Sequence, residues 1–209
     1  MSGQASFEGF EQPVAPTDRL FFALMPDEAA SAQALSLALH CSEAQGMKLR
    51  ANARERFHIT LFHVGDYVGL PAQVLEQANQ AAQQVQASPF EVRLDSLSSF
   101  KGGPRRVPLV LMSSFPQGLI DFHDRLQVQM HKAGLVEPGP KRAFRPHLTL
   151  LYGQRPVAEQ AIEAICWKAR AFVLVHSLIG QGRYIVLNRW ALGGGGQPPL
   201  GTFDRLTTT

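Results

Sequence analysis

The sequence has 209 residues, of which 45% are hydrophobic and 18% charged, and a formal net charge of +3. This suits a globular protein of one medium domain or two small fused lobes, and the mild positive charge permits a polyanionic substrate without requiring one. No apolar run approaches the roughly 18 residues of a membrane span, and residues 1–16 lack the regions of a signal peptide, so we expect a cytoplasmic protein.

The first part of the chain predicts two strands around a helix. Residues 1–17 are polar and read as a flexible tail, and residues 19–24 form an apolar run typical of a buried strand. A helix is expected from Pro26 to about His40, because Asp and Glu occupy its first turn. A second strand is expected over about 56–64, ended by the Gly-Asp pair that follows it.

The middle of the chain continues the alternation. Residues 71–87 have apolar positions at helical spacing, and residues 90–97 alternate as in a half-buried strand. A basic turn at 101–106 precedes an apolar strand at 107–112. A third helix is expected over 116–133, followed by a glycine suited to its C-terminus.

The last part predicts a strand at 144–152, a fourth helix from Pro156 to about Lys168, and strands at 171–178 and 183–192. Residues 193–209 are rich in Gly and Pro and read as a second flexible tail. The order of elements repeats approximately. We therefore expect an α+β fold in which residues 18–192 form one domain of two similar lobes, with mixing of strands between the lobes left open.

Cys41 and Cys166 both lie in apolar patterns interpreted as helical, so buried, reduced thiols are expected. Two isolated cysteines do not make a zinc site.

Two short segments carry the chemistry. His58 and Thr60 stand two residues apart in one predicted strand, and His147 and Thr149 repeat the pattern in another. Alternate residues of a strand face the same side, so each strand presents a histidine and a threonine together, opposite apolar neighbours. Two such strands would surround one small anion with two imidazoles and two hydroxyls.

This set of groups suits phosphodiester chemistry. Near neutral pH one imidazole can accept a proton while the other donates one, and hydroxyls can bind nonbridging phosphate oxygens. No acidic cluster adjoins either histidine, so neither a metal nor a cofactor is expected. The natural reaction is the opening of a strained cyclic phosphate by water.

Other residues have competing interpretations. His63 shares strand parity with apolar neighbours, so we expect it to face the core as a structural histidine. Arg145 shares parity with His147 and could bind phosphate, with a surface salt bridge as an equal alternative. Phe100 reads as buried packing, and Tyr152 is a candidate for stacking on a base.

The segments 57–65 and 144–150 resemble the paired motifs of the two-histidine phosphoesterases, in particular the LigT-like RNA 2′,3′-cyclic phosphodiesterases once named 2′-5′ RNA ligases. The segments 19–24 and 184–192 are similar to the opening and closing strands of that family. The resemblance implies two pseudo-symmetric lobes of mostly antiparallel sheet with outer helices around a central cleft. It also implies hydrolysis of RNA or nucleoside 2′,3′-cyclic phosphates to 2′-phosphates, without a metal.

By the same resemblance, His58 would donate a proton to the departing 3′ oxygen and His147 would activate water. Thr60 and Thr149 would hold the phosphate. Many relatives carry a basic residue five positions after the second histidine, where this chain has Tyr152, so the substrate preference is open.

Two alternatives stay open at this point. The same site could join RNA ends through a 2′-5′ linkage or cleave 2′-5′ oligonucleotides, or the protein could bind nucleotides or RNA without turnover. We expect a monomer whose partners are RNA with cyclic phosphate ends or small cyclic nucleotides. The basic turn at 101–106 is interpreted as a solvated hairpin tip, with contact to an RNA backbone as its alternative.

Overall fold

The computed structural model describes residues 14–46, 54–101, 103, 106–140 and 143–193. Most of the two predicted tails therefore lies outside the described residues. Thr17 already belongs to the ordered fold, because its N–H donates to Tyr67 and its carbonyl accepts from Ile179. The regular elements are β1 (Asp18–Leu24), α1 (Glu28–Ala44), a 3₁₀ turn (Arg54–Arg56), β2 (Ile59–Tyr67), α2 (Ala72–Gln83), β3 (Phe90–Ser99), β4 (Val107–Met112), α3 (Gln117–Lys132), β5 (His147–Gly153), β6 (Gln160–Ala169), β7 (Ala171–Leu178) and β8 (Arg183–Ala191).

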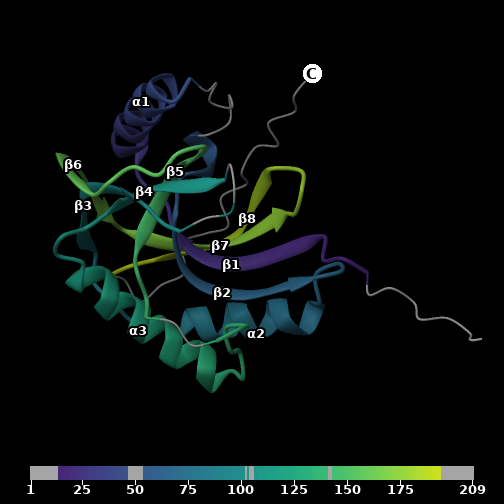
Figure 1. The fold of residues 1–209 in the computed structure, drawn as a ribbon. Coiled ribbons are helices and arrows are strands. Elements are labelled where there is room, and N and C mark those ends of the chain that lie inside the picture. Colours follow the sequence, from purple (N-terminus) through teal and green to yellow (C-terminus); the bar gives the residue numbers. More distant parts are fainter. Residues whose placement is uncertain (1–13, 47–53, 102, 104–105, 141–142, 194–209) are drawn as a thin grey trace, which may run out of the picture.

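The strands form one eight-stranded sheet in the order β6-β3-β4-β5-β2-β1-β7-β8, with antiparallel neighbours throughout (Figure 1). Between the two central strands, β5 and β2, only Ile59 and Leu148 are paired. The sheet therefore divides into two lobes of four strands, each with one His-x-Thr segment at its inner edge. This confirms the α+β, two-lobed architecture expected from the sequence.

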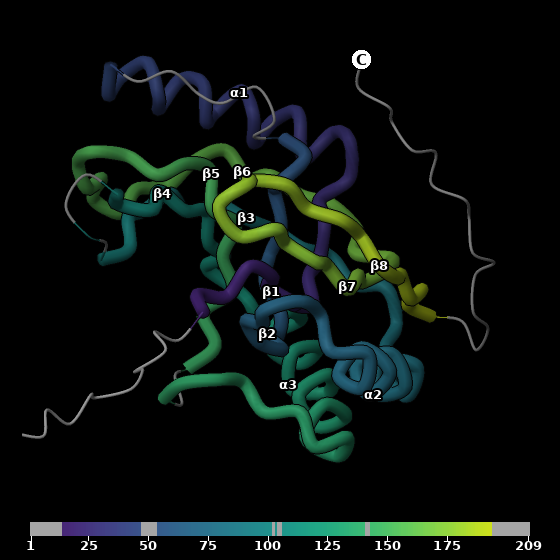
Figure 2. Tube along the Cα trace, turned by 90° about the vertical axis from the view of Figure 1, so that its right-hand side faces the viewer, coloured from purple at the N-terminus to yellow at the C-terminus, as the bar shows by residue number. Residues whose placement is uncertain are grey.

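The helices lie at opposite ends of the molecule. α1 contacts β5 and β6, whereas α2 and α3 contact each other and α3 also contacts β2 (Figures 1 and 2). α1 thus connects two strands of one lobe while packing on the other. α3 connects β4 and β5, and it contacts both β2 of the other lobe and β3 of its own. Among the residues that the structure describes, no helix combines the length and apolarity needed to cross a membrane.

The two faces of the sheet differ. A large apolar cluster joins the three helices to alternate strand residues, including Phe22, Ile59 and Leu148. A small cluster of Phe21, Ala23, Val173 and Val175 lies apart from it. Because side chains alternate along a strand, His58 and His147 point away from the large cluster and share the face that carries the small one. We call this side the histidine face.

The fourth helix predicted from Pro156 is wrong, because this segment forms β6. Its exposure alternates: Ile165 and Trp167 are buried, whereas Cys166 and Lys168 are exposed. Pairing with β3 allows the chain to bury one apolar row, which overrides the modest helix preference of its Ala and Glu residues. The predicted burial of Cys166 is wrong for the same reason, and the Cys41 thiol on α1 is only half-buried.

Several boundaries also differ. β2 continues through the Gly-Asp pair expected to end it, because Gly65 and Asp66 pair with Leu20 and Arg19 of β1. β5 begins at His147, three residues later than predicted. The end of α3 is as expected, since Gly134 follows it with a φ of 78°, in the left-handed region that favours glycine.

Candidate active site

The predicted histidines and threonines meet where the two lobes join. His58 immediately precedes β2, and His147 is the first residue of β5. The antiparallel pair Ile59–Leu148 sets the register between these strands. Continued by one residue in each direction, this register brings His58 opposite Thr149 and Thr60 opposite His147. All four side chains lie on the histidine face.

Matching bulges follow both motifs. Leu61 is an extra residue of β2 relative to β1, and Leu150 is an extra residue of β5 relative to β4. Each bulge shifts the alternation by one, so the fifth residue after each histidine returns to the histidine face. These residues are His63 and Tyr152. The expectation that His63 faces the core is therefore wrong, because simple strand parity ignores the bulge.

His63 instead belongs to an ion-pair network. Its Nε2 lies 2.9 Å from a carboxylate oxygen of Asp66, and Arg19 donates two bonds of 2.7 Å to the same carboxylate. These bonds, led by those from Arg19, lower the pKa of Asp66 to about 2. The network binds Nε2 of His63, which agrees with a structural role. Asp66 in turn raises the pKa of Arg19, and the phenols of Tyr184 and Tyr152 act in the same direction, so Arg19 lies within electrostatic reach of both.

Each site histidine has one nitrogen fixed by the backbone. Nδ1 of His58 lies 2.7 Å from the carbonyl oxygen of Arg56, and Nδ1 of His147 lies 2.8 Å from that of Arg145. A carbonyl oxygen only accepts, so Nδ1 of each ring carries the hydrogen and donates it. Nε2 is thereby left in both rings as the nitrogen for proton exchange.

Aromatic rings hold His58 in place. Its ring centroid lies 5.0 Å from that of Phe21 and 5.4 Å from that of Tyr184. The guanidinium of Arg56 lies 5.1 Å from the centre of the Tyr184 ring, and its Nε is buried without a hydrogen-bond partner among the described residues. A cation on an aromatic face is thus fixed beside the first histidine.

The second histidine has the same surroundings. Phe100 lies 4.7 Å from the ring of His147, and the guanidinium of Arg145 lies 4.8 Å from the centre of the Phe100 ring. Arg145 is exposed and makes no ion pair within the described part of the chain; its polar contact there is a weak one, 4.0 Å from the sulfur of Met112. The alternative of a surface salt bridge for Arg145 thus has no partner among these residues. Phe100 is half-buried and contacts the site, whereas the sequence indicated packing alone.

Burial makes both imidazoles poor cations in the free protein. Loss of solvent lowers the pKa of His58 to about 4, with smaller effects from the charges of His147 and Arg56, against a raising effect of its backbone hydrogen bond. Burial likewise lowers the pKa of His147. Both rings are consequently neutral at pH 7. The influence of His147 on His58 also shows that the two rings lie within electrostatic reach of each other.

Sequence reasoning missed Arg56 and Tyr184. Arg56 had a signal, because it precedes His58 by two residues just as Arg145 precedes His147. Tyr184 had none, because it lies on β8 and reaches the site only through the β1–β7–β8 pairing.

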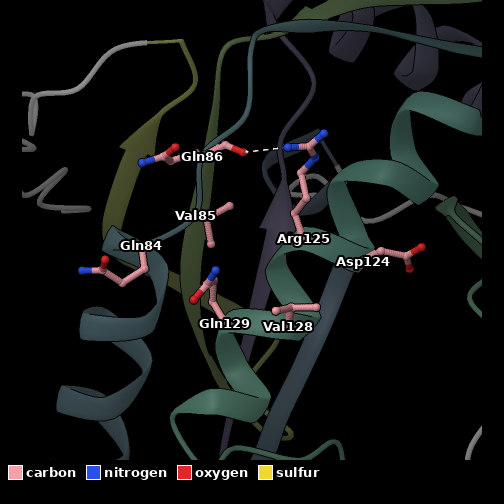
Figure 3. A pocket seen from close by; sticks show the side chains of 7 residues that line it. All are labelled: Gln84, Val85, Gln86, Asp124, Arg125, Val128 and Gln129. Atoms are coloured by element: carbon pink, nitrogen blue, oxygen red, sulfur yellow. Dashed lines mark hydrogen bonds between the residues drawn. The ribbon is translucent and has the colours of Figure 1, made fainter.

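Two further features bear on ligands. In the described ranges, no three His, Cys, Asp or Glu side chains gather in a way that could hold a metal ion. A separate hollow of about 500 Å³ lies between the end of α2 and α3, lined by residues such as Val85, Arg125 and Val128 (Figure 3). Arg125 there donates to the carbonyl of Gln86 at 3.5 Å. No predicted site residue lines this hollow.

A model of the 2′-5′ RNA ligase superfamily matches residues 22–179, which include both motifs and the strands that hold them. The chain belongs to the 2′-5′ RNA ligase superfamily. Among solved structures, this superfamily member is similar to LigT of E. coli in complex with 3′-AMP, at 25% identity and a TM-score of 0.64, over 85% of this chain and 99% of that one.

TT0787 of Thermus thermophilus has a similar fold, at 23% identity and a TM-score of 0.67, over 85% of this chain and 100% of that one. Usb1 of Kluyveromyces marxianus shares the fold at 11% identity and a TM-score of 0.50, over 84% and 99% of the two chains. No curated protein sequence matches this superfamily member. The fold is that of the LigT-like two-histidine phosphoesterases, as the motifs predicted, and the family supports phosphoesterase activity in general.

Proposed function

We propose that this protein hydrolyses the 2′,3′-cyclic phosphates of RNA ends or nucleosides to 2′-phosphates, without a metal. The observation that carries the proposal is the matched pair of histidines at the junction of the lobes, each with Nδ1 held by a backbone carbonyl and Nε2 left for proton transfer. A cyclic phosphate requires one proton acceptor and one donor on opposite sides of phosphorus, which such a pair supplies.

In the proposed reaction, Nε2 of His147 takes a proton from water as the water oxygen bonds to phosphorus. The bond from phosphorus to the 3′ oxygen breaks, and Nε2 of His58 gives its proton to that oxygen. Thr60 and Thr149 donate hydrogen bonds to the nonbridging oxygens, where charge grows. His58 must be protonated for this step although burial favours its neutral form. The negative phosphate between the rings favours the protonated form and offsets part of that effect.

The direct test is turnover of adenosine 2′,3′-cyclic phosphate and of an RNA trinucleotide with a 2′,3′-cyclic end, in buffer with a chelator. We expect 2′-phosphate products. His58→Ala and His147→Ala should each lower kcat/KM by roughly 10²–10⁴-fold, and the double variant by less than the product of both, because the two groups act in one transition state. His40→Ala, an exposed histidine on α1, is the matched control and should retain full activity.

The alternatives give different results. A 2′-5′ linked product as the main species would replace hydrolysis with ligation. Release of fragments with a 5′-hydroxyl and a 2′,3′-cyclic phosphate from 2′-5′ oligonucleotides would favour cleavage of that linkage. Tight nucleotide binding with no turnover between pH 5 and 8 would leave a binding protein. Equal rates for the wild type, His58→Ala and His147→Ala would show that neither histidine takes part in the reaction.

A further inference from the structure

Arg106 and Tyr152 form a pair on the histidine face that the proposed reaction does not use. The Arg106 guanidinium lies 4.7 Å from the centre of the Tyr152 ring. Tyr152 is opposite Pro108 in the β4–β5 pairing, and Arg106 precedes Pro108 by two residues, so backbone alternation places both side chains on one face. The bulge at Leu150 makes this the face of His147 and Thr149.

The guanidinium of Arg106 differs from that of Arg19, which lies in the lobe formed by β2, β1, β7 and β8. Arg19 is on β1, opposite Asp66, and its guanidinium donates two hydrogen bonds of 2.7 Å to that carboxylate. Among the described residues, no carboxylate pairs with Arg106. Arg106 is exposed and Tyr152 has a relative exposure of 45%, so both side chains are accessible to a ligand. An aromatic face orients a guanidinium while leaving its N–H donors free for an anion.

The distance of Arg106 and Tyr152 from the histidines indicates which phosphate group they could bind. Along the strand, the backbone of Tyr152 lies roughly 13 Å from that of His147 and roughly 7 Å from that of Thr149, because one of the intervening residues is the bulge. Arg106 lies farther out, four residues along β4 from Val110, the partner of Thr149, which is roughly 13 Å beyond the threonine. Its guanidinium therefore lies at the outer end of the site rather than between the histidines. It suits another phosphate of the same RNA strand, one or two nucleotides from the cyclic end.

We infer that Arg106, supported by the ring of Tyr152, is a second phosphate subsite that favours RNA ends over nucleoside cyclic phosphates. The inference rests on the proposed function for the position of the first phosphate. A nucleoside 2′,3′-cyclic phosphate has no further phosphate and gains nothing from Arg106. An RNA end presents one, and a hydrogen-bonded guanidinium–phosphate contact adds binding that discriminates between the two substrates.

The test compares kcat/KM for the cyclic-ended trinucleotide with that for adenosine 2′,3′-cyclic phosphate. Arg106→Ala should lower this ratio by about tenfold, in keeping with the loss of one charge-assisted contact. Arg106→Lys keeps the charge and should recover part of the ratio. Arg125→Ala, which removes the same charge from α3 on the other side of the sheet, should leave the ratio at the wild-type value.

A second readout excludes a merely structural effect. For the trinucleotide, the slope of log KM against log salt should decrease in magnitude by about 0.7 in Arg106→Ala, as expected for one lost single-strand phosphate contact. An unchanged ratio and slope would overturn the inference while leaving the hydrolase intact. Binding of a labelled trinucleotide with a 3′-phosphate, measured by fluorescence anisotropy, provides the same comparison of variants even if no substrate is hydrolysed. Hydrolysis of neither substrate would overturn the proposed function, and equal binding by wild type and Arg106→Ala would overturn the subsite.

Discussion

The side chains around the two histidines repeat one arrangement almost residue for residue. In each lobe an arginine lies two positions before the histidine, and its backbone carbonyl accepts a hydrogen bond from Nδ1 of the imidazole. The guanidinium of the same arginine lies over an aromatic ring that also contacts the imidazole. The rings come from unrelated places, Tyr184 on β8 and Phe100 after β3. Both arrangements give the same result: an imidazole that is fixed in place, partly shielded from solvent and free at Nε2. The two lobes reach this result with different aromatic residues.

The low basicity of both histidines predicts an acidic optimum. In the proposed mechanism one ring must be protonated and the other neutral, and burial lowers the pKa of both below the ordinary 6.5, that of His58 to about 4. We expect kcat/KM for a cyclic nucleotide to peak below pH 6.5 and to fall toward pH 8 as the donor loses its proton. The measurement is kcat/KM from pH 4 to 8.5 at constant ionic strength.

Bound phosphate raises the pKa of the donor, so the basic limb of kcat should lie at higher pH than that of kcat/KM. Circular dichroism at each pH confirms that the protein is folded. A kcat/KM optimum above pH 7 would contradict the assignment of buried, weakly basic rings.

At the level of elements, β6 shows what the sequence pattern could not decide. The segment from Pro156 contains Ala, Glu and Ile residues that suit a helix, and its last residues also alternate as a strand. A partner strand decides between these states, and that partner, β3, is distant in sequence: the paired residues Arg93 and Cys166 are 73 positions apart. Strands with continuous apolar runs, such as β4 and β7, were predictable because their composition leaves no helical alternative of adequate length.

The bulges at Leu61 and Leu150 were beyond prediction for a related reason. A bulge is a property of two strands in register, and neither strand alone indicates an extra residue. The positions of His58, Thr60, His147 and Thr149 precede the bulges, so simple alternation placed them correctly. His63 and Tyr152 follow them, and His63 was assigned to the wrong face.

The strand assignment of β6 predicts which cysteine reacts. Cys166 is exposed on β6, whereas Cys41 is half-buried on α1 and burial raises the pKa of its thiol. Because the thiolate is the reactive form, a disulfide reagent such as DTNB should label Cys166 of the native protein faster than Cys41.

The matched variants are Cys166→Ser, which should lose the fast phase, and Cys41→Ser, which should keep it. Slow labelling of both thiols, released only by denaturant, would support the buried helix that the sequence pattern indicated.

For the whole molecule, acid should weaken the fold in two stages. A histidine whose folded pKa lies below 6.5 binds protons more weakly in the folded than in the unfolded state, so stability is lost as pH falls from 6.5 toward 4. For His58 this amounts to at most about 3 kcal/mol, from the lowering to about 4. Asp66, whose pKa is lowered to about 2, and Asp18, lowered by Thr17 and His176, contribute stability that is lost only below about pH 4.

Urea denaturation at pH 7, 5.5 and 4.5 measures the first stage. We expect the free energy of unfolding to decrease over this range in the wild type and to decrease less in His58→Gln, which cannot take up the proton. His40→Gln, at an exposed position on α1, should follow the wild type. A wild-type free energy that is constant over the three pH values would contradict the folded-state pKa of His58.

The two lobes were predictable as matching halves, because each His-x-Thr strand has similar neighbours in sequence order. Their exact composition was not, because one lobe combines β1 and β2 with β7 and β8 from the far end of the described chain. Pairing of β1 with β7 depends on the twist and length of every element between them. The sequence left such mixing open, and the structure shows that it occurs.

The interleaved strand order also bears on how the chain matures on the ribosome. The strands β3 to β6 are contiguous in sequence and can assemble while translation continues, whereas β1 must wait for β7 with its outer hydrogen-bonding edge unpaired. Tyr184, the ring beside His58, lies on β8 and follows β7 in the chain. A nascent chain therefore exposes an unpaired strand edge until β7 has been synthesised, and its first histidine gains its aromatic neighbour only after β8 has followed.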